Sequence, residues 1–145
     1  MKLLVQEVVT ELKQLMTVGD EHIDVTNIRP HIYKHLAPAG SLSIEIRDTN
    51  NRVIATSNSV TITDISGSNY FHGYVKFDIN AHLQSGQSYY IALKASGYTF
   101  SEAAWVGWCT DYDLRKYDAD YSQATGFCSA MDLEIWEKRD RIRGY

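Results

Sequence analysis

The sequence predicts an all-β protein folded as a sandwich of two antiparallel sheets. Apolar and polar residues alternate with a period of two in many short runs, as they do in strands with one buried face. Residues that favour turns separate these runs, and no helix is indicated apart from one ambiguous N-terminal segment. The chain has 145 residues, enough for one domain with a sizeable core. About eight short strands of this kind are typical of a two-sheet sandwich.

The stretch from Asn69 to Trp108 carries the strongest strand signals. Strands are predicted over Tyr70–Ile79, Ser88–Lys94 and Ala103–Cys109. The first of these places Tyr70, His72 and Tyr74 on one side of the strand. Residues 83–87 have the composition of a turn, in which Gly86 can take a positive φ. Because the three strands follow one another with turns between them, we expect them to pair as an antiparallel meander.

The segment of residues 2–18 fits two structures. Its apolar residues fall largely at helical spacing, which would give an amphipathic helix. Its Val and Thr content instead favours strands, and Leu12, Gln14, Met16 and Val18 would share one face of a strand. We favour two strands, over residues 3–10 and 13–18, while the helix stays open as the alternative.

The clearest strand is predicted at Ser41–Arg47. Residues 48–51 (D-T-N-N) have hairpin-turn composition, so residues 52–57 are expected to form the partner strand. Further strands are predicted over residues 31–36, 60–63 and 131–137. Pro30, which lacks an N–H group, predicts an edge position or a bulge in the run that contains it. The predicted core includes Leu42, Ile44, Ile46, Phe77, Ile91 and Leu93.

Composition and charge exclude several classes of protein. The net charge of −4 argues against a general nucleic-acid-binding surface. No run of eighteen apolar residues is present, and the N-terminus lacks the pattern of a signal peptide, so we expect synthesis in a cytoplasm. Cys109 and Cys128 are expected to be buried thiols, and their pairing as a disulfide stays open.

The order of motifs resembles a known family. Along the chain, the motifs follow in the order GSLSIEI, a D-T-N-N turn, RVIATS, YFHGYVKFDI, L-x-x-G-Q-S-YYIAL and a late WVGW. This resembles the galactose-binding-like jelly-roll domains of carbohydrate-binding modules and of structural proteins of tailed phages, over roughly residues 12–137. The resemblance implies a jelly-roll sandwich without catalysis or cofactors, which either binds a sugar or packs within a virion. An arm of about residues 1–11 and a charged tail of about residues 138–145 would extend from the body and contact neighbours.

Catalysis has weak support in the sequence. Two carboxylates at a suitable separation could act as a glycosidase pair. The candidates are Glu102, Asp111, Asp113, Asp118, Asp120 and Glu134. His72, between Tyr70 and Tyr74, could serve as a base. No recognised catalytic or nucleotide-binding motif is present, so we expect the carboxylates to be solvated, His72 to pack on a strand, and the protein not to be an enzyme.

The segment from residue 111 to residue 126 is predicted to be a long surface loop with two possible roles. Its D-x-D pairs, Asp111 with Asp113 and Asp118 with Asp120, could supply oxygens to Ca²⁺, although an ordinary acidic loop is the preferred interpretation. The best candidate surface for a ligand or partner combines aromatic residues with one arginine: Trp105, Trp108, Tyr112, Arg115, Tyr117 and Tyr121. Alternatively, Trp105 and Trp108 belong to the core.

These observations lead to two functional hypotheses. The first is a non-enzymatic structural protein of a phage particle, in the capsid decoration, tail or fibre, made in the host cytoplasm. Its partners would be other virion proteins and copies of itself, with neither nucleic acid nor membrane insertion. The second is a carbohydrate-binding module that recognises a cell-surface glycan.

Overall fold

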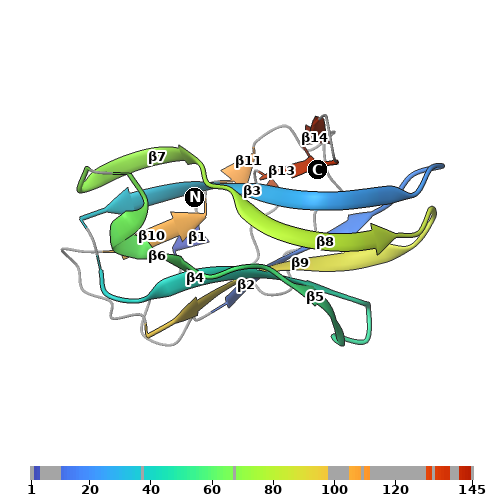
Figure 1. Cartoon of the computed structure of the whole chain (residues 1–145), viewed down its shortest axis with the longest axis horizontal. Helices are drawn as coiled ribbons and strands as arrows, with labels where there is room; N and C mark the ends of the chain where they lie inside the picture. The colour runs from blue at the N-terminus through green and yellow to red at the C-terminus, as the bar shows by residue number, and fades with distance from the viewer. Residues whose placement is uncertain are drawn as a thin grey trace.

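A computed structural model of the chain describes residues 2–3, 11–36, 38–66, 68–97, 105–108, 110–111, 130–131, 133–137 and 141–144. Within these ranges the protein is all-β and consists of two antiparallel sheets packed face to face (Figure 1). The short 3₁₀ helix η1 (Ile62–Asp64) is the one helical element of this part of the chain. None of the helices described there is long and apolar enough to cross a membrane.

The first sheet is built around β3, a strand of 13 residues. Its strands are β1 (Lys2–Leu3), β10 (Trp105–Trp108), β3 (Ile23–His35), β13 (Leu133–Trp136) and β14 (Arg141–Gly144), with β7 (Tyr70–Tyr74) and β8 (Phe77–Leu83) also paired to β3. The second sheet contains β2 (Glu11–Thr17), β9 (Ser88–Ser96), β4 (Ser41–Arg47) and β5 (Val53–Thr56), with β6 (Val60–Thr61) also paired to β4. A separate two-stranded ribbon joins β11 (Thr110–Asp111) to β12 (Ala130–Met131).

The strand order is that of a jelly roll. Counting β5 with β6 and β7 with β8 as single strands gives eight successive strands from β1 to β10. One sheet then has the order first, eighth, third, sixth, and the other the order second, seventh, fourth, fifth. Every connection except that between β4 and β5 therefore crosses from one sheet to the other, which confirms the predicted jelly-roll sandwich.

The predicted meander is wrong. β8 pairs with β3 and β9 pairs with β2 and β4, so the strands on either side of the Gly86 turn lie in different sheets. β10 in turn joins the first sheet through β3. The alternation of residues 70–79 has the predicted phase, but two strands, β7 and β8, share it. Alternation shows which side chains point inward and leaves open which strands are neighbours.

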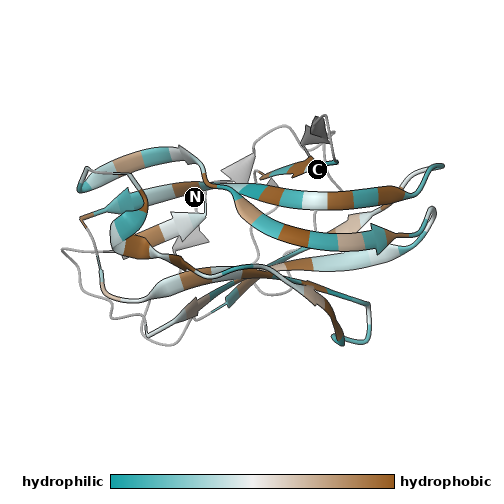
Figure 2. Ribbon diagram, viewed as in Figure 1, coloured by the Kyte–Doolittle hydropathy of each residue, from teal (hydrophilic) through white to brown (hydrophobic). Residues whose placement is uncertain are grey.

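The core lies between the two sheets, where buried side chains of both interdigitate. Brown and teal bands alternate along β3 and β8 in Figure 2, as period-two burial requires. All six residues predicted for the core are buried: Leu42, Ile44, Ile46, Phe77, Ile91 and Leu93. The strand interpretation of the N-terminal segment is confirmed for β2, in which Leu12, Gln14 and Met16 face inward. Of the other predicted strand, over residues 3–10, Leu3 belongs to β1, and residues 4–10 lie outside the described ranges.

Pro30 lies within the central strand, so of the two predicted alternatives the edge position is wrong, while the register of β3 against β8 does shift, between Val25 and Asn27. Both neighbours of β3 change at this residue. On one side β8 ends its pairing near Ile28 and β7 begins at His31, with the N–H of Val75 donating to the Pro30 carbonyl (3.0 Å). On the other side β13 pairs up to Pro30 and β10 begins at Ile32. The proline therefore falls between the β8 and β7 ladders on one side and at the last pair of the β13 ladder on the other, where its missing N–H interrupts neither ladder.

The hairpin between β4 and β5 is confirmed. The carboxylate of Asp48 accepts hydrogen bonds from the N–H groups of Asn50 and Arg52, both at 2.9 Å, and Asn51 has a φ of 67°. Asn tolerates this left-handed conformation better than most residues, which explains why the turn forms here. On β5, Ala55 is the residue packed against the core, while Val53 and Ile54 are exposed.

The chain ends are partly in the first sheet. β1 pairs with β10, and β14 pairs with β13, so residues 141–144 form a strand where a tail extending from the body was expected. Unpaired strand edges recruit further strands because their N–H and C=O groups need partners. Cys109, Cys128 and residues 112–126 lie outside the described ranges.

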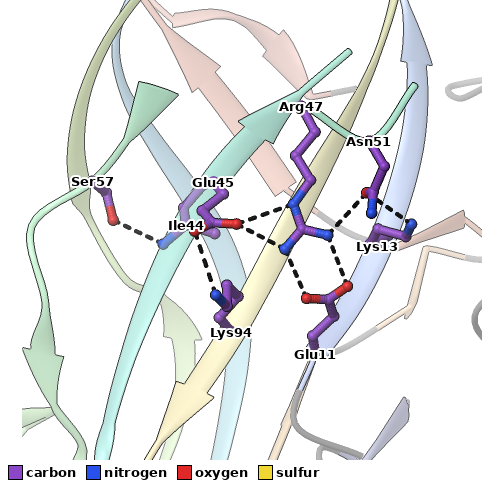
Figure 3. Close-up of polar contacts among 8 residues, drawn as sticks. All are labelled: Glu11, Lys13, Ile44, Glu45, Arg47, Asn51, Ser57 and Lys94. Carbon is purple, nitrogen blue, oxygen red and sulfur yellow. Dashed lines mark hydrogen bonds and ion pairs between the residues drawn. The ribbon is translucent and has the colours of Figure 1, made fainter. Parts of the chain in front are cut away.

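A charged network lies on the outer face of the second sheet, where it joins side chains of β2, β4 and β9 (Figure 3). Arg47 donates all five of its N–H groups, to both carboxylate oxygens of Glu11 (2.7 and 2.8 Å), to Glu45 (2.7 and 3.0 Å) and to Asn51 (3.0 Å). It reaches Glu11 across Ala92, which lies beside Glu45 in the β4–β9 ladder and is fully buried. We call this set, with Lys94 and Lys13 at its margin, the Arg47 network.

Candidate functional site

All five histidines of the chain lie on the strands of the first sheet or next to them, on its outer side. His31 and His35 belong to β3, His72 to β7 and His82 to β8, while His22 directly precedes β3. In β3 the intervening residues Ile32 and Lys34 are buried, so the histidines at alternate positions point away from the core. The same alternation turns Tyr33 outward.

At the β7 end of this sheet, six rings form three cross-strand pairs. We call them the His–Tyr face: His31, Tyr33 and His35 of β3, and Tyr74, His72 and Tyr70 of β7, which are their respective partners in the ladder. Directly opposed residues in an antiparallel ladder have their side chains in contact, so the pairing register itself assembles the face.

The rings of the His–Tyr face contact one another closely. Nε2 of His31 and Nδ1 of His72 are 2.8 Å apart and share a hydrogen bond, with ring centroids separated by 4.9 Å. Tyr74 also lies 5.0 Å from His31, and Tyr33 stacks on His72 at 6.2 Å. The His35 and Tyr70 rings meet edge to face at 5.1 Å. These separations suit favourable aromatic contacts, so the rings hold one another in place.

Two tyrosines of the face are open to solvent. Tyr70 is 56% exposed and Tyr74 is 42% exposed, which makes them two of the four exposed large hydrophobic residues in the described part of the chain. Exposed rings gathered on one face mark a surface suited to binding, whereas single exposed apolar residues carry no such meaning.

The underside of β7 explains its YFHGY sequence. Phe71 and Gly73 face inward, and the Phe71 ring occupies the space beside Gly73, since a Cβ atom added there would lie 3.0 Å from Phe71 Cζ. Phe71 packs against the core cluster. Glycine therefore lets one large ring anchor the strand from below, while the alternate residues present rings above it.

A buried lysine supports the same region. Lys34 is only 1% exposed and points inward, where its amine donates a hydrogen bond to the carbonyl oxygen of Ile65, just after η1. Burial lowers the pKa of Lys34, because the charged amine loses hydration that one carbonyl only partly replaces. The contact ties the η1 segment to β3 beneath the His–Tyr face.

The structure corrects one residue of the predicted binding surface. Trp108 is fully buried in the core, as the alternative interpretation had it, because it pairs with the inward-facing Ile32 of β3. The backbone of Trp105 pairs with that of His35, and the structure describes only the backbone of Trp105. The remaining predicted surface residues, Tyr112, Arg115, Tyr117 and Tyr121, lie outside the described ranges, as do Asp113, Asp118 and Asp120 of the calcium hypothesis. Asp111 is described only as backbone of β11.

The structure describes the side chains of two of the catalytic candidates. His72 contacts His31 and Tyr33, and Glu134 accepts a hydrogen bond from the indole N–H of Trp136 at 3.1 Å. Neither contact joins a histidine to a carboxylate. Glu102 lies outside the described ranges.

The His–Tyr face was not predicted from the sequence as one unit. Its two halves, H-I-Y-K-H and Y-F-H-G-Y, are both visible as alternating runs of rings on the polar side of a strand. The two runs form one face only because β3 and β7 pair, and the register of that pairing places each histidine beside a tyrosine.

No family model, no curated protein and no solved structure matches this chain. The geometry of the described residues and the motif resemblance therefore carry the functional argument.

Proposed function

We propose that this chain is a non-enzymatic structural protein of a phage particle, which packs against another virion protein or another copy of itself through the His–Tyr face. The resemblance of its motifs to jelly-roll proteins of tailed phages supports the setting. The most distinctive of those motifs, YFHGYVKF, includes the whole of β7 and thus half of the face. The same residues therefore support both the assignment to a phage particle and the His–Tyr face as the contact surface.

The observation that carries this proposal is the exposure of Tyr70 and Tyr74 within an ordered array of rings. Aromatic residues are enriched in protein–protein interfaces, where they bury a large area at a small cost in conformational entropy. Here the cross-strand contacts already restrict the rings, which lowers that cost further. A face of this kind is suited to binding a complementary surface without rearrangement.

The test compares two double variants of the full chain. Y70S/Y74S removes the exposed rings of the His–Tyr face. V53S/I54S is the matched control, since these side chains of β5 are exposed to a similar degree, 47% and 44%, on the other sheet. Analytical ultracentrifugation measures self-association, and co-sedimentation with particles lacking the protein measures docking.

We expect Y70S/Y74S to lose self-association or particle binding, while V53S/I54S retains it and both variants melt cooperatively near the parent temperature. Equal behaviour of the two variants would contradict the assignment of the face. Failure of the parent chain to associate with itself or with particles would contradict the virion proposal.

A carbohydrate-binding role is the second candidate, and the same rings favour it. Sugars stack their apolar faces on exposed aromatic rings, and the imidazoles of His31 and His72 beside Tyr74 offer polar groups to hydroxyls. Saturation-transfer NMR with glycans selected on an array distinguishes this role. Specific transfer that disappears in Y70S/Y74S supports it, whereas association without any glycan signal supports packing.

A further inference from the structure

A second cluster of polar side chains lies at the opposite end of β3 from the His–Tyr face, where β8 ends (right side of Figure 1). It consists of His22, Asp24 and His82, which we call the His22 cluster. His22 and Asp24 alternate with the buried Ile23 and Val25, so both point away from the core. His82 is the direct ladder partner of Asp24 on β8.

The three side chains converge on one another. Nδ1 of His82 lies 2.7 Å from Oδ1 of Asp24, and Nε2 of His22 lies 3.3 Å from Oδ2 of the same carboxylate. The two imidazole rings are 4.8 Å apart, and one potential ligand atom from each residue lies within 4.8 Å of the others. All three side chains are exposed.

From this geometry we propose that His22, Asp24 and His82 bind a divalent transition-metal ion of the zinc class. Two imidazole nitrogens and one carboxylate oxygen suit Zn²⁺, Co²⁺, Ni²⁺ or Cu²⁺, whereas Ca²⁺ and Mg²⁺ prefer sites made entirely of oxygen. Zinc ligands at about 2.0–2.2 Å from the ion lie about 3.3–3.6 Å from one another in a tetrahedron. Closing the present separation requires small rotations of exposed side chains, which neighbouring atoms do not oppose as a packed core would.

The surroundings leave room for further ligands. A shallow, open depression borders the cluster and is lined by Asp24, Thr26, Asn80 and His82 among others. The main-chain N–H of Asp24 donates to Glu137 (3.3 Å), which fixes the backbone that carries the carboxylate. Three protein ligands leave at least one coordination position for water or for a side chain of another molecule. Binding would link the beginning of β3 to the end of β8.

The test uses full-length chain without an affinity tag, treated with a chelator and then dialysed. Isothermal titration with ZnCl₂ gives the stoichiometry and affinity, and CoCl₂ gives a visible absorption spectrum that reports the ligands. The variants are D24N and H82Q. The matched control is H31Q/H72Q, which removes two other histidines that contact each other on the same outer face.

We expect one equivalent of Zn²⁺ to bind the parent chain and a visible Co²⁺ band to appear. D24N and H82Q should each weaken Zn²⁺ binding at least tenfold, because even loss of a residue that only supports a ligand costs about 10- to 100-fold in metal affinity. H31Q/H72Q should bind as the parent does. Circular dichroism spectra without metal should show the same β-sheet fold for all variants.

Three results would overturn the proposal. These are no saturable Zn²⁺ binding by the parent, binding unchanged in both D24N and H82Q, or binding lost in H31Q/H72Q and retained in the cluster variants. None of these results affects the packing role of the His–Tyr face, which the tyrosine variants test separately.

Discussion

Replacing Arg47 with methionine tests whether the Arg47 network stabilises the second sheet. The side chain of Arg47 is 7% exposed, and its five N–H groups satisfy Glu11, Glu45 and Asn51. Methionine has similar length without charge, so the variant leaves two carboxylates close together over Ala92 without their shared cation. The substitution therefore removes the charge and largely preserves the packing.

The expected loss follows from the burial of the partners. Removing one partner of a buried ion pair costs about 3–5 kcal/mol. The side chain of Glu11 is 28% exposed and that of Glu45 is 13% exposed, so water can rehydrate Glu11 in part. We therefore expect R47M to lower the free energy of unfolding by about 2–4 kcal/mol. R47K should lose about 1–2 kcal/mol, since an ammonium group keeps the charge but cannot reproduce the bidentate bonds.

Equilibrium unfolding in urea measures these changes, with the slope against denaturant checked for constancy. The double variant R47M/E45Q serves as the control, because removing the more buried carboxylate should recover part of the loss. If R47M changes stability by less than about 1 kcal/mol, the network has only the small effect of a surface ion pair, and the argument from burial fails.

Three further predictions concern pH, the core and a turn. The Arg47 hydrogen bond lowers the pKa of Glu11 below its ordinary 4.5, so the unfolded chain binds more protons in acid than the folded chain does. The stability that the Glu11 carboxylate contributes should be fully present above about pH 4.5 and be lost as the pH falls through the folded pKa. E11Q should flatten this dependence in urea titrations from pH 6 to pH 2. Leu93→Ala removes a fully buried side chain and should cost about 2–5 kcal/mol; an unchanged urea midpoint would refute the inward phase of β9. Gly86→Val should cost about 1–2 kcal/mol of stability through backbone conformation, because Gly86 has a φ of +73° and an added Cβ would meet no atom within 4 Å. Gly19→Val is the control, since an added Cβ there also meets no atom and Gly19 has no positive φ. Thermal melting should show a smaller loss of stability for Gly19→Val than for Gly86→Val.

The sequence by itself determined the properties that depend on neighbouring residues. Alternation placed Leu42, Ile44 and Ile46 inward, because successive side chains of a strand point to opposite faces. The D-T-N-N turn was predictable for the same local reason, since the Asp48 side chain satisfies N–H groups two and four residues further along. Two alternating halves of the His–Tyr face were also visible.

Only the tertiary structure decided which strands became neighbours. His31 and His72 are 41 positions apart, Arg47 and Glu11 are 36 apart, and Asp24 and His82 are 58 apart, yet each pair is in contact. The entropy of closing a loop changes slowly with its length, so chain distance alone hardly distinguishes one pairing from another. The meander and the crossed jelly roll have the same inward and outward residues. The choice between them, and with it the His–Tyr face and the His22 cluster, comes from the packing of two sheets around one core.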